Sequence, residues 1–142
     1  MGRARPVKGS KISLVVNEAG LPIAVDVCAG NTHDLKACGT LVYSIPKGSK
    51  MTADRGYDSK LFRRKIRRRG IQPVIPKRKM KPNARKRIPS PVTYKNRWLV
   101  ERCFAWMEKF KRLTTRYERH AFLYKALWQL AASVILLDKL TG

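Results

Sequence analysis

Residues 50–59 read KMTADRGYDS, a short strand-forming segment that ends in the carboxylate of Asp54 and turns at Gly56. A helix is predicted directly after it, over 60–69, because a serine or aspartate can cap its first turn and a glycine ends it. A second short strand is predicted over 71–75, near a sheet edge because it contains a proline. This order of strand, helix and strand indicates an α/β fold.

The residues before this segment predict a β-hairpin. Apolar, β-branched segments that favour strands occur over 11–16 and 21–28, with a turn at 17–20 between them. A short helix, capped by Asn31 or Thr32, is expected to follow the hairpin.

Two long helices are predicted at the other end of the chain. One begins after Thr93, and the last covers roughly 120–140, where apolar residues occur on nearly every side, as expected for a core helix. Residues 76–93 are rich in proline and basic residues, so they are expected to form a basic mobile loop. Residues 1–142 are therefore predicted to be a single α/β domain. Its mixed sheet contains the hairpin and two short strands, with flanking helices and two long C-terminal helices.

Positive charge is the most unusual property of the sequence. The chain has 32 Lys and Arg against 9 Asp and Glu, a formal net charge of +23, and half of the basic residues lie in 59–100, which holds no acid. Such a surface attracts polyanions, so nucleic acid is the first partner to consider. Arg85, Lys86 and Arg87 are expected to contact DNA phosphates, which add affinity without reading sequence. Charge alone would also fit a ribosomal or RNA-coating protein, but the apolar last helix argues against that class.

Several classes of protein are excluded by the sequence. Residues 1–10 are basic and have no apolar region behind them, so they are not a signal peptide. The longest apolar stretch, Ala131–Leu137, is too short to span a bilayer. Cys28, Cys38 and Cys103 form no CxxC pair, so reduced thiols in a cytosolic protein are expected. No zinc-finger spacing, Walker loop or GxSxG motif is present.

Two carboxylates are candidates for chemistry. Asp54 ends a short strand ahead of a glycine turn, where α/β folds place metal and phosphate chemistry, although it could simply begin the turn. Glu101 is the first acid after the 42 residues of 59–100, and it could bind a metal or pair with Arg97 or Arg102. Together the two carboxylates suit a hard divalent cation such as Mg²⁺, whose remaining positions can take phosphate.

The two histidines carry weaker signals. His33 precedes Asp34, and this pair could be catalytic or could do no more than cap the helix that follows. His120 has no partner nearby in the sequence and is expected to be structural. A catalytic role for either histidine is the minor interpretation.

Taken together, the motifs resemble one family, the bacterial insertion-sequence transposases with an RNase H-like DDE core, in the groups named after insertion sequences five and four. The resemblance covers nearly the whole chain. The blocks that carry it occur in the family's order and are Lys8–Lys11, Ala29–Asp34, Asp54–Ser59, Gly70–Pro76 and the helix Tyr94-x2-Arg97-x3-Glu101, which continues to Phe110–Leu113.

This resemblance implies specific roles. Asp54 would be the second catalytic aspartate and Glu101 the catalytic glutamate, and both would bind a pair of Mg²⁺ (or Mn²⁺) ions. Such ions activate a water or a 3′-hydroxyl group for DNA strand cleavage and strand transfer. Tyr94 and Arg97 match the tyrosine–arginine–glutamate–lysine signature and are expected to meet DNA phosphate or brace the site. The implied partner is DNA, at element ends and target, and the implied location is the bacterial cytoplasm, at the nucleoid, without a membrane.

Two departures from the family pattern bear on activity. The signature's lysine falls at Glu108, and Lys109 lies one residue further, rotated by about 100° on a helix. The family's first catalytic aspartate belongs to a strand before the hairpin, and the sequence shows no such strand. Asp26 lies in the second hairpin strand and is not a convincing replacement. With two protein ligands instead of three, metal binding is expected to be weak and the chain inactive alone.

The sequence is therefore interpreted as the carboxyl-terminal part of a DDE transposase, an incomplete RNase H-like catalytic domain. Its further partners would be copies of itself or the amino-terminal part of the enzyme. The alternative is a non-catalytic remnant that binds DNA and competes with the intact transposase for element ends. The pair Asp54 and Glu101 favours the first interpretation, because a protein that only binds DNA has no use for aligned carboxylates.

Overall fold

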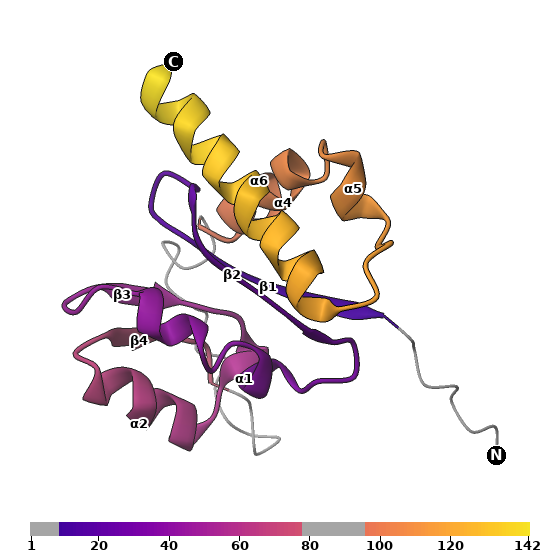
Figure 1. Cartoon of the computed structure of the whole chain (residues 1–142). Coiled ribbons are helices and arrows are strands. Elements are labelled where there is room, and N and C mark those ends of the chain that lie inside the picture. Colours follow the sequence, from indigo (N-terminus) through magenta and orange to yellow (C-terminus); the bar gives the residue numbers. More distant parts are fainter. Residues whose placement is uncertain (1–8, 78–95) are drawn as a thin grey trace, which may run out of the picture.

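The fold is seen in a computed structural model, which describes residues 9–77 and 96–142 (Figure 1). The first half contains β1 (Ser10–Val16), β2 (Pro22–Ala29), the one-turn helix α1 (Asp34–Ala37) and the 3₁₀ turn η1 (Leu41–Ser44). It continues with β3 (Lys50–Thr52), the 3₁₀ turn η2 (Arg55–Tyr57), α2 (Lys60–Arg68) and β4 (Gln72–Val74). The second half contains α4 (Arg97–Met107), α5 (Lys111–Thr114) and α6 (Ala121–Thr141).

The four strands form two separate two-stranded sheets. β1 and β2 make the predicted antiparallel hairpin, whereas β3 and β4 pair in parallel and are joined by α2. The α/β class, the hairpin, both short strands and α2 are therefore as predicted. The single mixed sheet is not seen within the described residues, because no backbone ladder connects the hairpin to β3.

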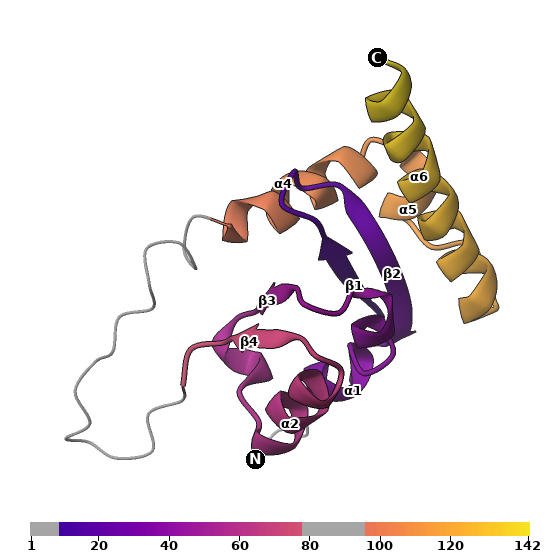
Figure 2. The same ribbon diagram turned by 90° about the vertical axis from the view of Figure 1, so that its left-hand side faces the viewer.

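The hairpin has two buried faces, which hold the two halves of the molecule together. Ile12, Leu14 and Val25 pack into a core shared with α4, α5 and α6. Val15 and Ala24 point to the opposite face and pack against a second core, formed around α2 and η1. Successive side chains of a strand point to opposite faces, so one short hairpin can serve both cores. In Figure 2 the hairpin accordingly lies between the C-terminal helices and the β3–β4 unit.

Local signals explain α2 and its neighbours. The Ser59 hydroxyl accepts a hydrogen bond from the Phe62 amide at 3.5 Å, so the predicted N-cap is confirmed. Gly70 ends the helix with a φ of 73°, a left-handed conformation that glycine adopts without a steric penalty. Ile66 and Ile71 are fully buried in the second core, which fixes α2 against β4.

The short helix after the hairpin differs from the prediction. α1 has only one turn, and the His33 ring accepts the capping hydrogen bond from the Leu35 amide at 3.4 Å, in place of Asn31 or Thr32. The three cysteines are free, as expected, and burial raises the pKa of Cys38 and Cys103 to about 11.

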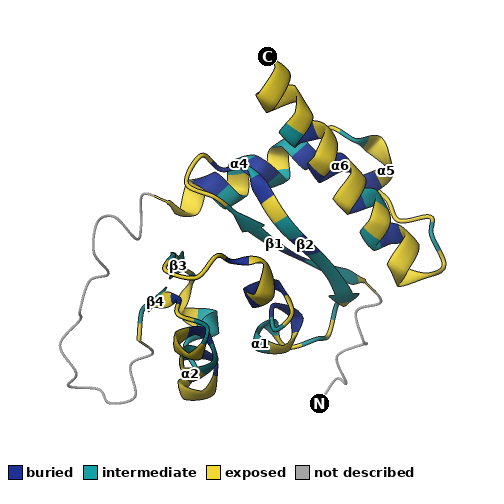
Figure 3. Ribbon diagram, turned by 60° about the vertical axis from the view of Figure 1, so that its left-hand side comes forward, coloured by how far each residue is buried: buried dark blue, intermediate teal, exposed yellow. Residues whose placement is uncertain are grey.

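Only one side of the last helix is buried in the core. Its buried face contains Tyr124, Trp128 and Ile135, and the Tyr124 hydroxyl donates to the Leu113 carbonyl at 2.6 Å. Other apolar residues on α6 face solvent, such as Leu130 and Leu137, whose exposed fractions are 62% and 60% (Figure 3). The expectation of complete burial is therefore wrong, because the fold offers this helix a core on one side only.

α6 also meets the length and composition expected of a membrane-spanning helix. It is the one such helix within residues 9–77 and 96–142, and core helices of soluble proteins pass the same test. The sequence argument from uninterrupted apolar stretches did not detect it, because Lys125 and Gln129 interrupt the run.

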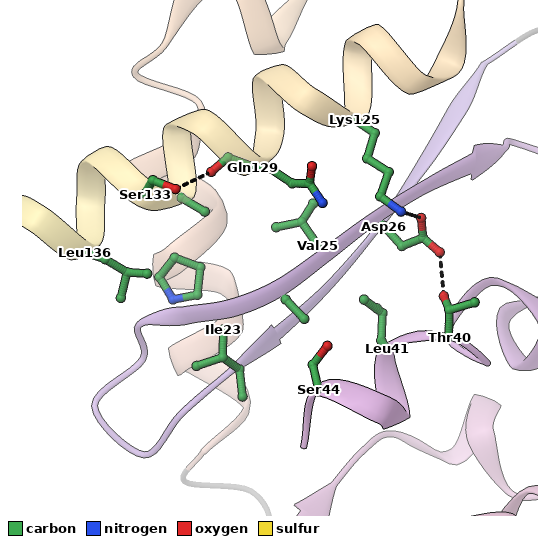
Figure 4. A pocket seen from close by; sticks show the side chains of 13 residues that line it. Ile23, Val25, Asp26, Thr40, Leu41, Ser44, Lys125, Gln129, Ser133 and Leu136 are labelled. Carbon is green, nitrogen blue, oxygen red and sulfur yellow. Dashed lines mark hydrogen bonds and ion pairs between the residues drawn. The ribbon is translucent and has the colours of Figure 1, made fainter. Parts of the chain in front are cut away.

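An ion pair connects α6 to the edge of the hairpin. Lys125 Nζ lies 2.9 Å from Asp26 Oδ1, and the Thr40 hydroxyl donates to Asp26 Oδ2 at 2.7 Å (Figure 4). Burial acts to raise the pKa of Asp26, but the hydrogen bonds from Lys125 and Thr40 outweigh it, so the pKa lies below 3.8. The carboxylate thus links β2, the loop before η1 and α6.

We expect Asp26→Asn to lower the free energy of unfolding at pH 7 by about 1–2 kcal/mol, because the charged hydrogen bonds are lost. A lowered pKa in the folded protein means that the stabilisation is present above about pH 4 and disappears as the pH falls through that pKa. Urea unfolding of both proteins at pH 7 and at about pH 2.5 should therefore show the difference shrinking in acid.

Asp138→Asn is the matched control, since the Asp138 side chain is 73% exposed and lies 3.6 Å from Lys139. It should change stability by less than about 0.5 kcal/mol at either pH. Equal effects of the two substitutions would contradict the role assigned to Asp26.

Candidate functional site

Asp54 stands where the chain leaves β3, as the sequence predicted. Its carboxylate is exposed and caps η2, accepting a hydrogen bond from the Gly56 amide at 2.8 Å. Gly56 leaves room for this carboxylate, because a Cβ atom there would lie 2.9 Å from Asp54 Oδ1 and would push it aside. The turn therefore fixes the carboxylate while leaving one of its oxygens available to a ligand.

A second carboxylate lies beside Asp54. Asp34 Oδ2 is 3.5 Å from the same Cβ position on Gly56, so both acids border one glycine. Lys11 holds Asp34 in place, because its Nζ lies 2.7 Å from Asp34 Oδ1 and donates to the Thr32 carbonyl at 2.6 Å. From the sequence, Asp34 was interpreted mainly as part of a helix cap. No spacing pattern indicates that it lies close to Asp54, which is about twenty residues further along the chain.

Negative charge gathers at this point of a basic protein. Burial is the main cause that raises the pKa of Tyr57 to about 12, and the nearby carboxylates of Asp34 and Asp54 contribute to the shift. Asp58 does not belong to this group, because it forms an ion pair with Arg63 at 2.7 Å. Arg63 also donates to the Ile75 carbonyl at 2.6 Å, so the Asp58 pair secures the end of β4.

Glu101 lies on the exposed side of α4. The helix buries Leu99, Cys103 and Met107, and the glutamate points away from that face. The alternative interpretation, in which Glu101 pairs with Arg97 or Arg102, is not seen. Glu101 forms no ion pair in the part of the chain that the structure describes. The carboxylate is therefore free to meet a ligand, as expected for a residue with a chemical role.

Arg102 anchors α4 to the turn of the hairpin. Its guanidinium group stacks on Trp98 at 4.5 Å and on Trp106 at 4.8 Å, and donates to the Ala19 carbonyl at 2.6 Å. Gly20 makes room for it: its φ is 78°, and a Cβ atom there would lie 2.6 Å from the guanidinium nitrogen. The turn thereby sets the position of the helix that carries Glu101.

The two predicted metal ligands belong to different parts of the structure. Asp54 follows β3 and lies between β3 and β4, beside the second core, whereas Glu101 lies on α4, which packs into the first core. No cluster of three or more Asp, Glu, His or Cys side chains suited to a metal occurs in residues 9–77 and 96–142. That Asp54 and Glu101 meet at one metal pair stays a prediction.

The predicted DNA-contacting residues are only partly visible. Tyr94, Arg85, Lys86 and Arg87, with most of the predicted loop 76–93, lie outside the described residues. Arg97 is exposed in the first turn of α4.

Most of the described basic residues of the segment 59–100 lie on α2. Lys60, Arg64, Arg67 and Arg68 are exposed along its outer side. Two further cations, Lys65 and Arg69, lie over the ring of Tyr43 at 5.1 and 4.4 Å. The exposed side of α2 therefore gathers cations, with the exposed Leu61 among them.

A groove of about 420 Å³ lies elsewhere, between β2, η1 and α6. It is lined by apolar side chains such as Ile23 and Leu136 and by the Asp26–Lys125 pair (Figure 4). Asp54, Asp34 and Glu101 are not part of it. The candidate carboxylates therefore lie outside this groove.

Comparison with known proteins identifies the family. The family model described as "Transposase DDE domain" matches residues 2–136. The chain belongs to the transposase DDE domain family. It is 37% identical over 144 residues to a Burkholderia cepacia protein named "Putative transposase for insertion sequence element IS402". That match covers 94% of this chain and 64% of the relative, so the chain spans less than two thirds of the transposase relative's length. No solved structure matches.

We expect Arg102→Ala to loosen α4 from the hairpin, because the stacking on both indoles and the hydrogen bond to Ala19 are lost. The free energy of unfolding should fall by about 1–2 kcal/mol. Hydrogen exchange should rise at 17–20 and along α4. Arg102→Lys should restore only part of this protection, because an ammonium group lacks the planar, multiply donating geometry.

Arg97→Ala removes an exposed arginine from the same helix and serves as the control, with exchange unchanged at the turn. Unchanged exchange at 17–20 in Arg102→Ala would show that the anchor lies elsewhere.

Proposed function

We propose that this chain is the carboxyl-terminal part of a DDE transposase, which binds DNA and, when complete, performs metal-dependent strand cleavage and strand transfer. The observation that carries the proposal is the family match over residues 2–136, which includes both Asp54 and Glu101. The exposed carboxylates on a molecule with a charge of +23 are consistent with it. The proposed location is the bacterial cytoplasm, at the nucleoid.

Asp54 and Glu101 would hold the Mg²⁺ or Mn²⁺ ions of this reaction. Carboxylate oxygens are the ligands that such hard cations prefer, and both side chains are exposed and free of ion pairs among the described residues. When bound, the ions supply charge stabilisation and an activated oxygen nucleophile. The protein's own part is to orient Asp54 through the Gly56 amide and to carry Glu101 on α4.

The contacts of Asp26 and Asp34 bear on which of these carboxylates could bind metal together with Asp54 and Glu101. Asp26 is engaged by Lys125 and Thr40, which occupy both of its carboxylate oxygens. Asp34 borders the same glycine as Asp54 and keeps an oxygen that Lys11 does not bind. If any acid of this chain completes the site, Asp34 is the better candidate.

The DNA surface would include the outer side of α2 together with the loop basic residues Arg85, Lys86 and Arg87. In the described part of the chain the partly buried Arg63 of α2 pairs with Asp58, and the four exposed cations of α2 take part in none of the ion pairs. A helix face of this kind attracts the phosphate backbone and releases counterions when it binds.

A second candidate function is a non-catalytic regulator that competes with the intact transposase for element ends. The concentration of charge on α2 favours it as much as the enzyme, because phosphate binding needs no carboxylate. Cleavage assays separate the two.

We expect the isolated 142-residue chain to bind DNA and to leave it uncut with Mg²⁺ or Mn²⁺, because a first aspartate is lacking. An upstream segment that supplies this aspartate in one polypeptide should give cleavage of element-end DNA. Asp54→Asn or Glu101→Gln should then reduce the cleavage rate at least about 1,000-fold, since each removes charge from the metal ligands.

Glu18→Gln, which neutralises an exposed acid in the hairpin turn, is the control and should leave the rate unchanged. Cleavage by the isolated chain would show that the fragment interpretation is wrong. In that case Asp34→Asn should abolish the activity, and Asp26→Asn should reduce stability only.

We expect replacement of Arg85, Lys86 and Arg87 by glutamine to weaken DNA binding without changing sequence preference. The slope of log affinity against log salt concentration should become shallower by about 2–3, because three phosphate contacts are lost. Lys139→Gln, at the far end of α6, is the control for a general loss of charge. A slope equal to that of the unaltered chain would show that these residues do not contact DNA.

A further inference from the structure

α2 and the 3₁₀ turn η1 together form a hollow on the surface of the protein. It has a volume of about 310 Å³ and is called the Tyr43 notch below. Four of its six lining residues are cations and none is an acid, so the notch suits a negatively charged ligand. The lining consists of Tyr43, Leu61, Arg64, Lys65, Arg68 and Arg69.

Helical spacing explains why the residues from α2 gather at the notch. Leu61, Arg64, Lys65 and Arg68 follow the spacing i, i+3, i+4 and i+7, so they share one side of the helix. A different side of α2 is buried in the second core through Ile66. The packing of the helix thereby turns the lining residues towards solvent, and Figure 3 shows exposed positions along α2.

The second core also fixes the position of Tyr43. Leu41 and Val42 of η1 are buried in that core, whereas the Tyr43 side chain is 62% exposed. Because its two preceding neighbours are held inside, the ring is held at the surface beside α2. The notch therefore has one rigid aromatic wall.

Two cations are held against this ring before any ligand binds. Lys65 Nζ lies 5.1 Å and Arg69 Cζ 4.4 Å from the centre of the Tyr43 ring. Lys65 also donates to the Gly39 carbonyl at 2.7 Å, and Arg69 donates to the Tyr43 carbonyl at 3.3 Å. Side chains that are already ordered lose less conformational entropy when they bind a ligand.

The positive charge of the notch is not neutralised by neighbouring acids. Its four cations take part in none of the ion pairs among residues 9–77 and 96–142. The Nε atom of Arg69 is buried and has no hydrogen-bond partner in the same part of the chain. A buried donor without a partner costs free energy, so an anion close to this guanidinium group would stabilise it.

We propose that the Tyr43 notch is a phosphate site that holds one phosphodiester group of DNA. The proposal rests on the proposed function, which makes DNA the polyanion that this chain meets. Arg64 and Arg68 would donate to the phosphate oxygens, and the two cations on the ring would add fixed positive charge. This site differs from general attraction to a basic surface, because it needs the ring of Tyr43, which carries no charge.

The chemistry of the notch favours a nucleic acid backbone over an acidic protein segment. Three of its four cations are arginines, whose planar groups donate two parallel hydrogen bonds to a phosphate. Lys60 and Arg67 are exposed on α2 but do not line the notch. DNA carries about one negative charge per 1.7 Å of duplex, so one backbone can fill the notch and meet these outer cations at the same time.

The first test removes the ring and keeps the charge. Tyr43→Leu should weaken binding of the full chain to a duplex of about 20 base pairs by about fivefold to tenfold, because the stacked cations lose their fixed positions. Fluorescence anisotropy of a labelled duplex measures the affinity. Urea unfolding establishes that the variant is folded.

Tyr117→Leu is the matched control for the ring. Tyr117 is 70% exposed and also lies under an arginine, with Arg112 Cζ 5.6 Å from the ring centre, but it is not part of the notch. The substitution should change the affinity for the duplex by less than about twofold.

The second test removes charge at two neighbouring positions. Arg67 and Arg68 are both exposed on α2, but only Arg68 lines the notch. Arg68→Gln should make the slope of log affinity against log salt concentration shallower by about 1, because one phosphate contact is lost. Arg67→Gln removes the same charge and should change the slope by less than about 0.5.

Polyglutamate tests an acidic protein segment as the ligand. Its affinity for the full chain should fall by less than about twofold in Tyr43→Leu, because the notch is assigned to phosphate.

Three results would overturn the proposal. One is a DNA affinity that Tyr43→Leu leaves unchanged. Another is an equal effect of Arg67→Gln and Arg68→Gln on the salt slope. The third is polyglutamate binding that depends on Tyr43 as strongly as DNA binding does. In all three cases the unaltered chain still binds DNA and the proposed function stands, whereas a chain that binds no DNA would overturn both.

Discussion

The alternation of side chains along β1 and β2 is the constraint on which the arrangement depends. Leu14 and Val25 on one face complete the core under α4 and α6, and Val15 on the other face completes the core around α2. A shift of one residue in strand register would exchange these faces and remove apolar contacts from both cores together. The same two strands also set the distance between Lys11, which holds Asp34, and the turn at Ala19, where Arg102 anchors α4. Both candidate carboxylate regions are thus positioned by one hairpin.

Opposite charges are separated in a way that suits chemistry on a polyanion. A net charge of +23 draws phosphate to the molecule, and α2 concentrates cations on one exposed side. Close to this helix, Asp34 and Asp54 border one glycine, and Lys11 neutralises only the first. A phosphate backbone that approached Asp54 directly would be repelled, so in the proposed function a divalent cation between the two would give the carboxylate a part in DNA binding as well as in cleavage.

Features that depend on neighbouring residues could be predicted from the sequence, and features that depend on distant ones could not. The hairpin, α2 with its Ser59 cap and the Asp54 turn follow from side chains within a few positions. The division into two sheets depends on the path of the chain between the hairpin and β3, and the position of Asp34 beside the Asp54 turn depends on the same path. The sequence has no local signal for that path. The alternative that Glu101 pairs with Arg102 is not seen for a similar reason, because two indole rings and a distant carbonyl bind the guanidinium group.

The exposure of one apolar face of α6, which contains Leu130 and Leu137, follows from the same hairpin. Rotating α6 to bury Leu130 would turn Trp128 out of the first core and move Lys125 away from Asp26. Loss of a buried aromatic side chain costs several kcal/mol, more than burial of one additional leucine returns. The helix is therefore held with one apolar face inside and another outside, although its composition would allow either.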